Sequence, residues 1–321
     1  MSDQEGSASA MGIESGLTSI VIVAADSGPL LRECVARVLA SSGRVEIIVI
    51  DNASSDGQPQ AVRSSHAGES RLHVQLNSRN VGFGSACNQG AALAAGDALL
   101  FLNPDCLIES DTIVRLRRVG ESHAEAGLLG VCICEEDGEP AAAIRRRDPS
   151  LRRALMSLTG LARFEPFWPA LAGVEIPSGA PTRDPELLEN VDAVSGACMW
   201  MPRLVFDRIG GFDEGYFLHC EDLDLCRRVR DGGNQVLLVN AIRVRHAQGS
   251  SSAHRLIEVA RSKHQSMWRY FRKFDAAASN ALLAAIVFVG IWIHYLLKLP
   301  GLWWRTATSV RRSAAQARSP R

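Results

Sequence analysis

The sequence has no excess of charge of either sign. Its 321 residues include 35 basic and 35 acidic side chains, so the formal net charge is zero. The two signs are unevenly distributed, because residues 261–321 hold 11 Lys and Arg but only one acid, Asp275. The other 260 residues therefore carry 24 basic and 34 acidic side chains. An acidic main body argues against broad binding to nucleic acid, and we expect no nucleic-acid partner.

The sequence also lacks paired cysteines, a secretory signal and internal repeats. The eight cysteines form no CxxC pair and mostly stand among apolar residues, which is typical of reduced cysteines in a core. Residues 1–16 are small, polar and acidic, without the charged start and the apolar run of a secretory signal. We therefore expect a disordered leader over residues 1–16 and a main body in the cytoplasm.

What the sequence does contain is an alternation of strand and helix patterns. Near-continuous apolar runs predict buried strands at 18–25, 45–51, 72–77 and 97–103. Between them, one helical pattern opens on a proline and closes on a glycine, and another is rich in small residues. Four strands joined by helical crossovers predict an α/β fold with a mainly parallel sheet and helices on both faces.

The second half of the chain is less regular at first. A helix is expected near 111–121 and a strand near 128–134, but residues 135–190 hold prolines, glycines and the basic stretch IRRRDPSLRR. This composition indicates a long, partly mobile insertion. The patterns then predict a strand over 191–201, a proline-led helix from 202, a helix over 221–233, one or two strands over 234–246 and a basic helix over 253–274.

The stretch FLNPDC, residues 101–106, ends the fourth predicted strand. A residue that precedes proline avoids helical geometry, so we expect Asn103 to continue the strand and Asp105 to sit just past its end. Asp51 ends the second predicted strand at the same edge, where open α/β sheets bind their ligands. Asn-Pro is also a common turn initiator, so the stretch taken alone could be a turn without a functional role.

Two further stretches bring flexible or acidic residues to the start of a helix. In NVGFG, residues 80–84, two glycines precede a helix and would let backbone amides approach a ligand; a tight turn needed only for packing is the alternative. In LHCEDLDLCRRV, apolar residues three apart share one helix face, which puts Glu221 and Asp222 at the helix N-terminus. Acids in a first turn are also ordinary helix design.

Together these stretches resemble the family 2 glycosyltransferases, more closely their rhamnosyltransferase-like branch. The similarity covers roughly residues 17–275 and is carried, in order, by VIDNASSDG, RNVGFGSACNQG, LLFLNPDC, VSGACMWM and GGFDEGYFLHCEDLDLCRRVRDGG, then by His246 and GSSS. It implies a GT-A fold with a mainly parallel, Rossmann-like sheet, a nucleotide-sugar donor, a divalent metal (Mg²⁺ or Mn²⁺) and inversion at the sugar carbon. Residues 17–135 would form the nucleotide-sugar-binding half and residues 190–250 the acceptor and catalytic half.

The resemblance also implies roles for individual residues. Asp105 would hold the metal, with His246 as a further ligand. Neutral imidazole suits Mn²⁺ better than Mg²⁺. Asp222 would be the general base that takes a proton from the acceptor hydroxyl, with Glu221 as the second candidate. The nucleotide-sugar site would include Asp51, Arg79, Asn80, Gly82, Asn88, Asn103 and Gly196.

The chain departs from the family pattern at two places. Asn103 stands where the family has the first Asp of its DxD motif, and the tripeptide Ala24–Asp26 stands where relatives often have aromatic and asparagine residues. Two other features stay open. Trp200 could stack on a sugar face or pack in the core, and the arginine-rich residues 145–153 could bind acceptor phosphates or form a solvated, flexible loop.

The C-terminal residues 276–321 form a separate apolar and basic extension. Residues 281–297 contain only one polar side chain, His294, but are shorter than the about 20 residues that span a bilayer. Trp303 and Trp304, with basic residues on either side, resemble an interfacial anchor. We therefore expect helical, membrane-associating structure, peripheral on the inner face of the cytoplasmic membrane. A helix pair packed on the protein, or on a second subunit in a homodimer, is the alternative.

The sequence as a whole predicts an inverting glycosyltransferase of bacterial envelope polysaccharide synthesis. The resemblance implies L-rhamnose, from dTDP-rhamnose, as the sugar that is transferred and a saccharide or lipid-linked saccharide as the acceptor. A transferase of the same fold that uses a UDP-hexose is one alternative. A non-catalytic nucleotide-sugar-binding scaffold is the other.

Overall fold

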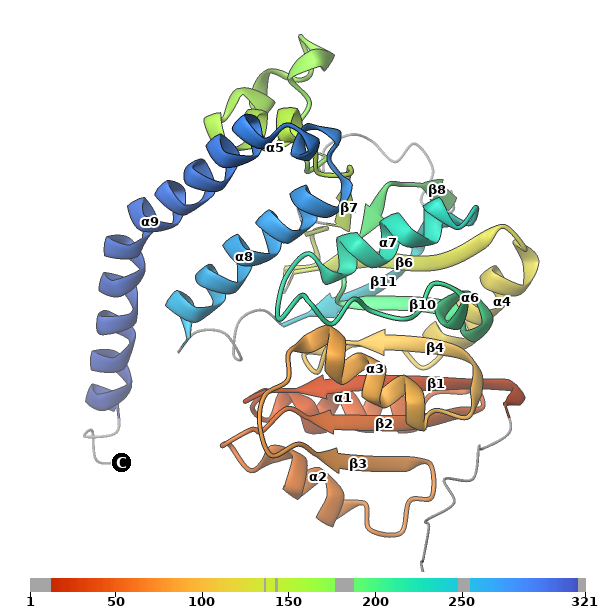
Figure 1. Ribbon diagram of the computed structural model, residues 1–321. Coiled ribbons are helices and arrows are strands. Elements are labelled where there is room, and N and C mark those ends of the chain that lie inside the picture. Colours follow the sequence, from red (N-terminus) through yellow and green to blue (C-terminus); the bar gives the residue numbers. More distant parts are fainter. Residues whose placement is uncertain (1–12, 136, 142–143, 177–187, 248–254, 317–321) are drawn as a thin grey trace, which may run out of the picture.

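A nine-stranded mixed sheet forms the centre of the protein (Figure 1). The computed structural model describes residues 13–135, 137–141, 144–176, 188–247 and 255–316. The strands follow the order β3-β2-β1-β4-β10-β6-β11-β5, and β8 pairs with β11. Every one of the eight cysteines is a free thiol, and seven of them are buried.

The first half of the sheet is the parallel part that the sequence predicts. Its strands are β1 (Glu14–Ala24), β2 (Val45–Asp51), β3 (Leu72–Leu76) and β4 (Gly96–Leu102). Helices cross over between them as α1 (Leu30–Leu39), α2 (Gln58–Ser65) and α3 (Phe83–Leu93). The predicted α/β class is confirmed. The expected leader ends earlier than its predicted boundary at residue 16, because Glu14 already donates its backbone N–H to Ala95; residues 1–12 lie outside the described residues.

Two hydrophobic clusters lie on opposite faces of this sheet. Alternate β1 residues point to opposite sides, so Ile20 and Ile22 join one cluster while Val21 and Val23 join the other. The first cluster contains apolar residues of α1, α2 and α4 (Thr112–Ser122). The second contains apolar residues of α3, α6 (Arg203–Arg208) and α7 (Glu221–Asp231). Both faces are therefore covered, as predicted.

The second half of the sheet is mixed. Its strands are β5 (Cys106–Leu107), β6 (Ala126–Cys134), β8 (Leu188–Asn190), β10 (Cys198–Pro202) and β11 (Gln235–His246). Strand β10 runs antiparallel between β4 and β6, and β11 is parallel to β6. The expectation of one strand over 191–201 is wrong. The segment contains β9 (Ala193–Val194), a turn and then β10, because β9 leaves the main sheet and pairs with β7 (Arg145–Arg146).

The segment between β6 and β8 is more ordered than its composition indicates. It contains α5 (Leu151–Thr159) and the short 3-10 helices η2 (Leu161–Phe164) and η3 (Pro169–Leu171). The prediction of a long, partly mobile insertion missed these helices. In the described residues, ion pairs hold the arginine-rich stretch from several sides. These pairs are Arg145 with Glu189, Arg147 with Glu165, Arg153 with Asp192, and Asp148 with Arg227 and Arg230.

Two long helices follow the sheet. Helix α8 (Leu256–Phe274) is joined by η4 (Ala276–Ser279) to α9 (Ala281–Gln316), which continues through Pro300. The two pack side by side, with Trp268 and Phe288 ring centroids 5.1 Å apart (Figure 1). Because α9 does not stop at residue 297, its residues Ala281–Thr306 are long and apolar enough to cross a membrane by length and composition, and 11% of the most apolar window is buried.

Candidate active site

A cavity of about 430 Å³ opens at the edge of the sheet where β1, β2, β4 and β11 end. Asp105 and Asp222, the two acids on which the predicted chemistry depends, both line it. The other predicted site residues that line the same cavity are Asn80, Gly82, Asn103, Gly196, Glu221 and His246. The cleft therefore gathers residues that are far apart in the sequence, as expected for the carboxyl edge of an α/β sheet.

The NPD stretch forms a tight turn at this edge. The backbone N–H of Cys106 donates to the carbonyl of Asn103 at 3.0 Å, and Pro104 occupies the second position of the turn, where its fixed φ is favourable. Strand β4 ends at Leu102, although Asn103 still donates to Ala197 at 2.8 Å. The turn places Asp105 in the lining of the cleft. The backbone carbonyl of Asp105 accepts a hydrogen bond from the Ala247 amide at 3.0 Å.

Asp105 and His246 form a two-residue candidate metal site. His246 Nε2 lies 2.9 Å from Asp105 Oδ1, and apart from one another the two buried atoms have no hydrogen-bond partner in the described part of the chain. The Cys106 thiol is also near, but it donates to the Ala197 carbonyl and burial raises its pKa well above the usual range. One carboxylate and one imidazole fit Mn²⁺ or Mg²⁺, whose other ligands are phosphates and waters.

Asp222 is an ionised carboxylate held by three donors. Its Oδ2 accepts from Arg146 Nη2 and from the Gly196 amide at 3.2 Å, and its Oδ1 accepts from the Leu223 amide at 2.8 Å. Burial by itself would raise the pKa of Asp222, but the charge and hydrogen bond of Arg146 hold that pKa below its usual value. The N-terminus of α7 adds a favourable dipole. Asp222 is therefore ionised at neutral pH.

Glu221 has the opposite environment, although it is the next residue. It is buried, and burial together with the neighbouring negative charge of Asp222 raises its pKa to about 8. Its Oε2 has no hydrogen-bond partner among the described residues. Two adjacent carboxyl groups with separated pKa values are typical of active sites, because one stays charged and the other keeps its proton.

Arg146 is a site residue that the sequence interpretation did not single out. It lies on β7, and besides Asp222 its Nη2 contacts the Val194 carbonyl. Its Nε is buried without a partner in the described structure. The signal in the sequence was the run of three arginines, but nothing in that run shows which one pairs with Asp222. The expectation of a solvated loop is therefore wrong at this position.

Strained backbone gathers around the cleft. In the described residues, four side-chain-bearing residues have positive φ: Asp26, Ala53, His219 and Cys220. His219 and Cys220, at 69° and 64°, immediately precede Glu221, and His219 lines the cavity. Such conformations cost free energy and persist where the surroundings impose them, often at functional sites. No sequence pattern indicated His219, which we add to the candidate site.

The NVGFG loop is shaped by protein contacts rather than by outward amides. A Cβ on Gly82, whose φ is +91°, would lie 2.7 Å from the Phe217 carbonyl oxygen. The Gly82 amide donates to Asn80 Oδ1 at 2.9 Å, and the Phe83 amide donates to Phe217 at 2.9 Å. The expectation that these amides are free for a ligand is wrong for Gly82 and Phe83. The glycine is needed because two backbone segments meet here.

Asn52 takes the place at the cleft that we expected for Asp51. Asp51 is buried and accepts from the Ser54 amide at 2.8 Å, and it is not among the residues that line the cavity. Asn52 lines the cavity and donates to Asn80 Oδ1 at 2.9 Å, while its own Oδ1 accepts from the Val81 amide at 2.9 Å. Its position after a buried strand was the available signal.

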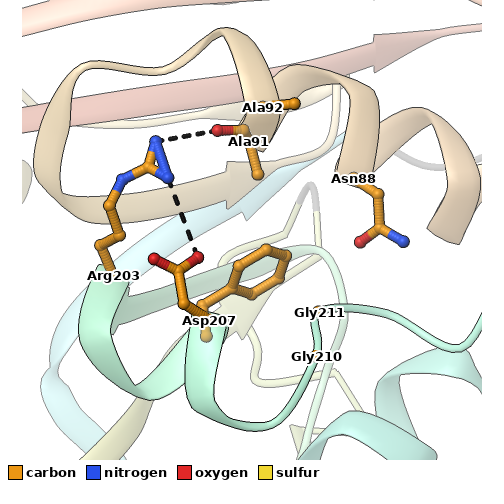
Figure 2. A pocket seen from close by; sticks show the side chains of 8 residues that line it. Asn88, Ala91, Ala92, Arg203, Asp207, Gly210 and Gly211 are labelled. Carbon is orange, nitrogen blue, oxygen red and sulfur yellow. Dashed lines mark hydrogen bonds and ion pairs between the residues drawn. The ribbon is translucent and has the colours of Figure 1, made fainter. Parts of the chain in front are cut away.

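Three other residues considered for the site do not reach the cleft. Asn88 lines a separate pocket of about 300 Å³ that shares no lining residue with it; Figure 2 shows Asn88 across that pocket from Arg203 and Asp207. The side-chain NH₂ of Asn88 donates to the Phe212 carbonyl, and its Oδ1 accepts from the Phe212 amide, each at 2.9 Å. Arg79 is exposed and outside the cavity lining. Trp200 is 3% exposed and belongs to the core.

Comparison with known proteins agrees with this geometry. Residues 19–210, more than half of the chain, match the family profile described as glycosyl transferase family 2. The chain belongs to this family. It is a glycosyltransferase, and its sheet and helices form the GT-A fold.

Several relatives of this family 2 glycosyltransferase have a known activity. It is 28% identical to N-acetylglucosaminyl-diphospho-decaprenol L-rhamnosyltransferase of Mycobacterium tuberculosis over an alignment of 264 residues. This alignment covers 78% of this chain and 82% of the relative. It is 25% identical over 276 residues to rhamnosyltransferase WbbL of Escherichia coli, covering 81% and 97%.

Solved structures share the fold at lower identity. The mannosyltransferase PcManGT from Pyrobaculum calidifontis, solved with GDP-Man and Mn²⁺, matches with a TM-score of 0.54 at 16% identity, over 95% of this chain and 76% of that one. S. aureus TarS 1-349 matches with a TM-score of 0.51 at 16% identity, over 90% and 78%.

Proposed function

We propose that this glycosyltransferase transfers L-rhamnose from dTDP-rhamnose to a hydroxyl of a lipid-linked saccharide, with inversion at the sugar carbon, in envelope polysaccharide synthesis. The observation that supports the reaction is the single cavity that Asp105 and His246 share with Asp222 and Glu221. The choice of sugar and acceptor is supported by the names of the two relatives, an N-acetylglucosaminyl-diphospho-decaprenol L-rhamnosyltransferase and a rhamnosyltransferase.

Asp222 is the general base in this proposal. Its Oδ1 accepts one hydrogen bond, from Leu223, and so keeps a lone pair that can accept the proton of the acceptor hydroxyl. As that proton moves to Asp222, the hydroxyl oxygen forms a bond to the anomeric carbon, and the bond to the diphosphate breaks with its electron pair. Arg146 and Gly196 fix the other oxygen, so the carboxylate cannot rotate away.

Asp105 and His246 face the leaving group. A bound Mg²⁺ or Mn²⁺ would neutralise the charge that develops on the departing diphosphate. Asp105 and His246 are the residues that would hold it, because their facing atoms lack other partners among the described residues. The imidazole favours Mn²⁺ over Mg²⁺.

Helix α8 connects the cleft with the apolar helix α9. Arg255, Glu258 and Val259, at the start of α8, line the cavity, and α9 packs along the same helix. His264 of α8 contacts His294 of α9 at 2.9 Å. We propose that the apolar α9 contacts the inner face of the cytoplasmic membrane and so brings the cleft to acceptors carried on lipid.

A thermal-shift screen of nucleotide sugars with Mn²⁺ tests the donor assignment. A ligand at 100 times its Kd stabilises the folded state by about 2.7 kcal/mol, so dTDP-rhamnose should raise Tm clearly. The His246→Gln variant is the matched control and should lose most of that shift. A shift with a UDP-hexose and none with dTDP-rhamnose would replace the proposed donor, and binding without any transfer would indicate a scaffold.

A further inference from the structure

The insertion between β6 and β8 presents apolar side chains that the described residues leave exposed. Helix α5 has no buried residue at all, although it carries several leucines. We name five exposed residues of α5, η2 and the loop before η3 the apolar edge: Leu155 (50% exposed), Leu158 (52%), Leu161 (38%), Phe167 (75%) and Trp168 (61%). Exposed apolar side chains gathered on one segment often mark an interaction surface.

The apolar edge is a built surface, because the insertion is held together by its own contacts. Arg152 donates to the Ala170 carbonyl, and the Val174 amide donates to Ser157 Oγ at 3.1 Å. The Phe164 ring lies 6.3 Å from the Trp168 ring. These contacts fold α5, η2 and η3 onto one another and leave the five side chains on the outside.

The charges beside the apolar edge are positive. The arginines on the inner side of the insertion pair with carboxylates, as described above. Arg152 and Arg163 have no carboxylate partner among the described residues, and Arg163 lies 4.7 Å over the Phe164 ring. The one acid of residues 151–171, Glu165, is paired with Arg147. The edge therefore suits a negatively charged surface.

The start of α5, the helix that carries part of the apolar edge, lies beside the segment that leads into α9. The Leu151 amide donates to Asp275 Oδ2 at 2.7 Å, which ties the start of α5 to the segment that leads into α9, and Figure 1 shows the two helices next to each other there. Helix α9 presents a solvent-facing stripe with a spacing of four and three residues: Leu282, Ile286, Val289, Ile293 and Leu296, all at least 51% exposed. Residues 276–316 contain no acid.

We propose that the apolar edge is a second membrane-binding element, which docks on anionic lipid headgroups beside α9. The inference rests on the proposed contact of α9 with a membrane, but it does not depend on the proposed reaction. Exposed Phe167 and Trp168 suit headgroup depth, and Arg152 and Arg163 suit anionic lipid. A second copy of the chain fits less well, because a symmetric contact would bring the same unpaired cations together.

Vesicle flotation of the full chain, without donor or acceptor, tests the proposal. The vesicles contain phosphatidylglycerol mixed with phosphatidylcholine, or phosphatidylcholine alone. The variant Leu155→Ser/Leu158→Ser/Phe167→Ser/Trp168→Ser should bind the anionic vesicles about tenfold or more weakly than the natural chain. Leu204→Ser is the matched control, since Leu204 is 69% exposed on α6 of the catalytic domain, and it should bind unchanged. Arg152→Gln/Arg163→Gln should reduce the dependence of binding on salt.

Three results would overturn the proposal. One is equal vesicle affinity for the serine variant and the Leu204→Ser control, when both keep the natural Tm. Another is a natural chain that sediments as a dimer and a serine variant that sediments as a monomer but still binds vesicles. This result would assign the apolar edge to contact with a second copy. The third is complete loss of binding in Ile286→Ser/Ile293→Ser alongside full binding in the serine variant, which would leave α9 as the whole membrane contact.

Discussion

Replacing Arg146 with methionine removes the charge that holds Asp222 in its ionised state. Both side chains are largely buried, 15% and 13% exposed, so the loss of one partner leaves an uncompensated charge. Breaking a buried pair costs about 3–5 kcal/mol, and the residual exposure favours the low end, about 3 kcal/mol. An adjacent arginine lowers the pKa of an aspartate by about 1–3 units. The pKa of Asp222 should therefore rise in the variant.

The assay is the pH dependence of kcat/KM for transfer to a soluble acceptor, together with urea unfolding. In Arg146→Met the acid limb of the profile should move to higher pH, because Asp222 must be ionised to accept a proton and loses the charge that lowers its pKa. Arg147→Met is the matched control. Arg147 pairs with Glu165 at similar burial, 21% and 17% exposed, but neither residue lines the cleft. The Arg147→Met variant should be less stable in urea, but the acid limb of its pH profile should not move.

A double-mutant cycle separates the charge effect from lost packing. If Arg146 acts through Asp222, then Arg146→Met should cost far less stability in an Asp222→Asn background than in the natural chain, by about 2 kcal/mol. An unmoved acid limb in Arg146→Met, or additive stability losses in the cycle, would refute this reasoning.

Three further predictions follow from the cleft. His246→Gln should raise the Mn²⁺ concentration that gives half-maximal transfer by about tenfold or more, and an unchanged midpoint in a Mn²⁺ titration would argue against a metal at Asp105 and His246. Gly82→Ala should cost about 3 kcal/mol in urea unfolding, because the added Cβ meets Phe217 at 2.7 Å at a φ of +91°; a loss under about 0.5 kcal/mol would contradict the close approach. Burial and the charge of Asp222 raise the pKa of Glu221 to about 8 in the folded state, whereas the unfolded state releases this proton near pH 4.5. The free energy of unfolding should therefore fall by about 2 kcal/mol as the pH rises from about 6 to 8. Glu221→Gln should lose this pH dependence, and an identical slope in both proteins would place the effect elsewhere.

The parallel half of the fold was predictable because its signals are local. Strands β1, β2 and β4 are buried over most of their length and each contains a run of Val, Ile, Leu or Phe, so each is recognisable without its neighbours. The NPD turn was predictable for the same reason, since proline restricts both its own φ and the residue before it. These elements alone place Asp105 at the edge of the sheet where the cleft opens.

The insertion was not predictable, because what orders it lies elsewhere in the chain. Arg146 is fixed by Asp222, and Asp148 by Arg227 of α7, which are 76 and 79 residues away. A stretch of arginines, prolines and glycines carries no local sign of such partners. The break between β9 and β10 has the same origin, because β9 pairs with β7 of the insertion.

Roles within the cleft depend on contacts that spacing does not reveal. Adjacent carboxylates look equivalent in the sequence, yet Asp222 faces Arg146 while Glu221 has a buried oxygen without a partner in the described structure. Similarly, Asn52 rather than Asp51 lines the cavity, because consecutive residues at a strand end point to opposite sides.

The central claim is that Asp222 accepts the proton while Asp105 and His246 hold the metal and the donor. It is tested most directly by measuring donor binding and single-turnover transfer of the Asp222→Asn variant with Mn²⁺. We predict a donor Kd within about twofold of the natural enzyme and a transfer rate lower by about a thousandfold, since a positioned base contributes about 10²–10⁴. A transfer rate that stays within about tenfold of the natural enzyme would contradict the account.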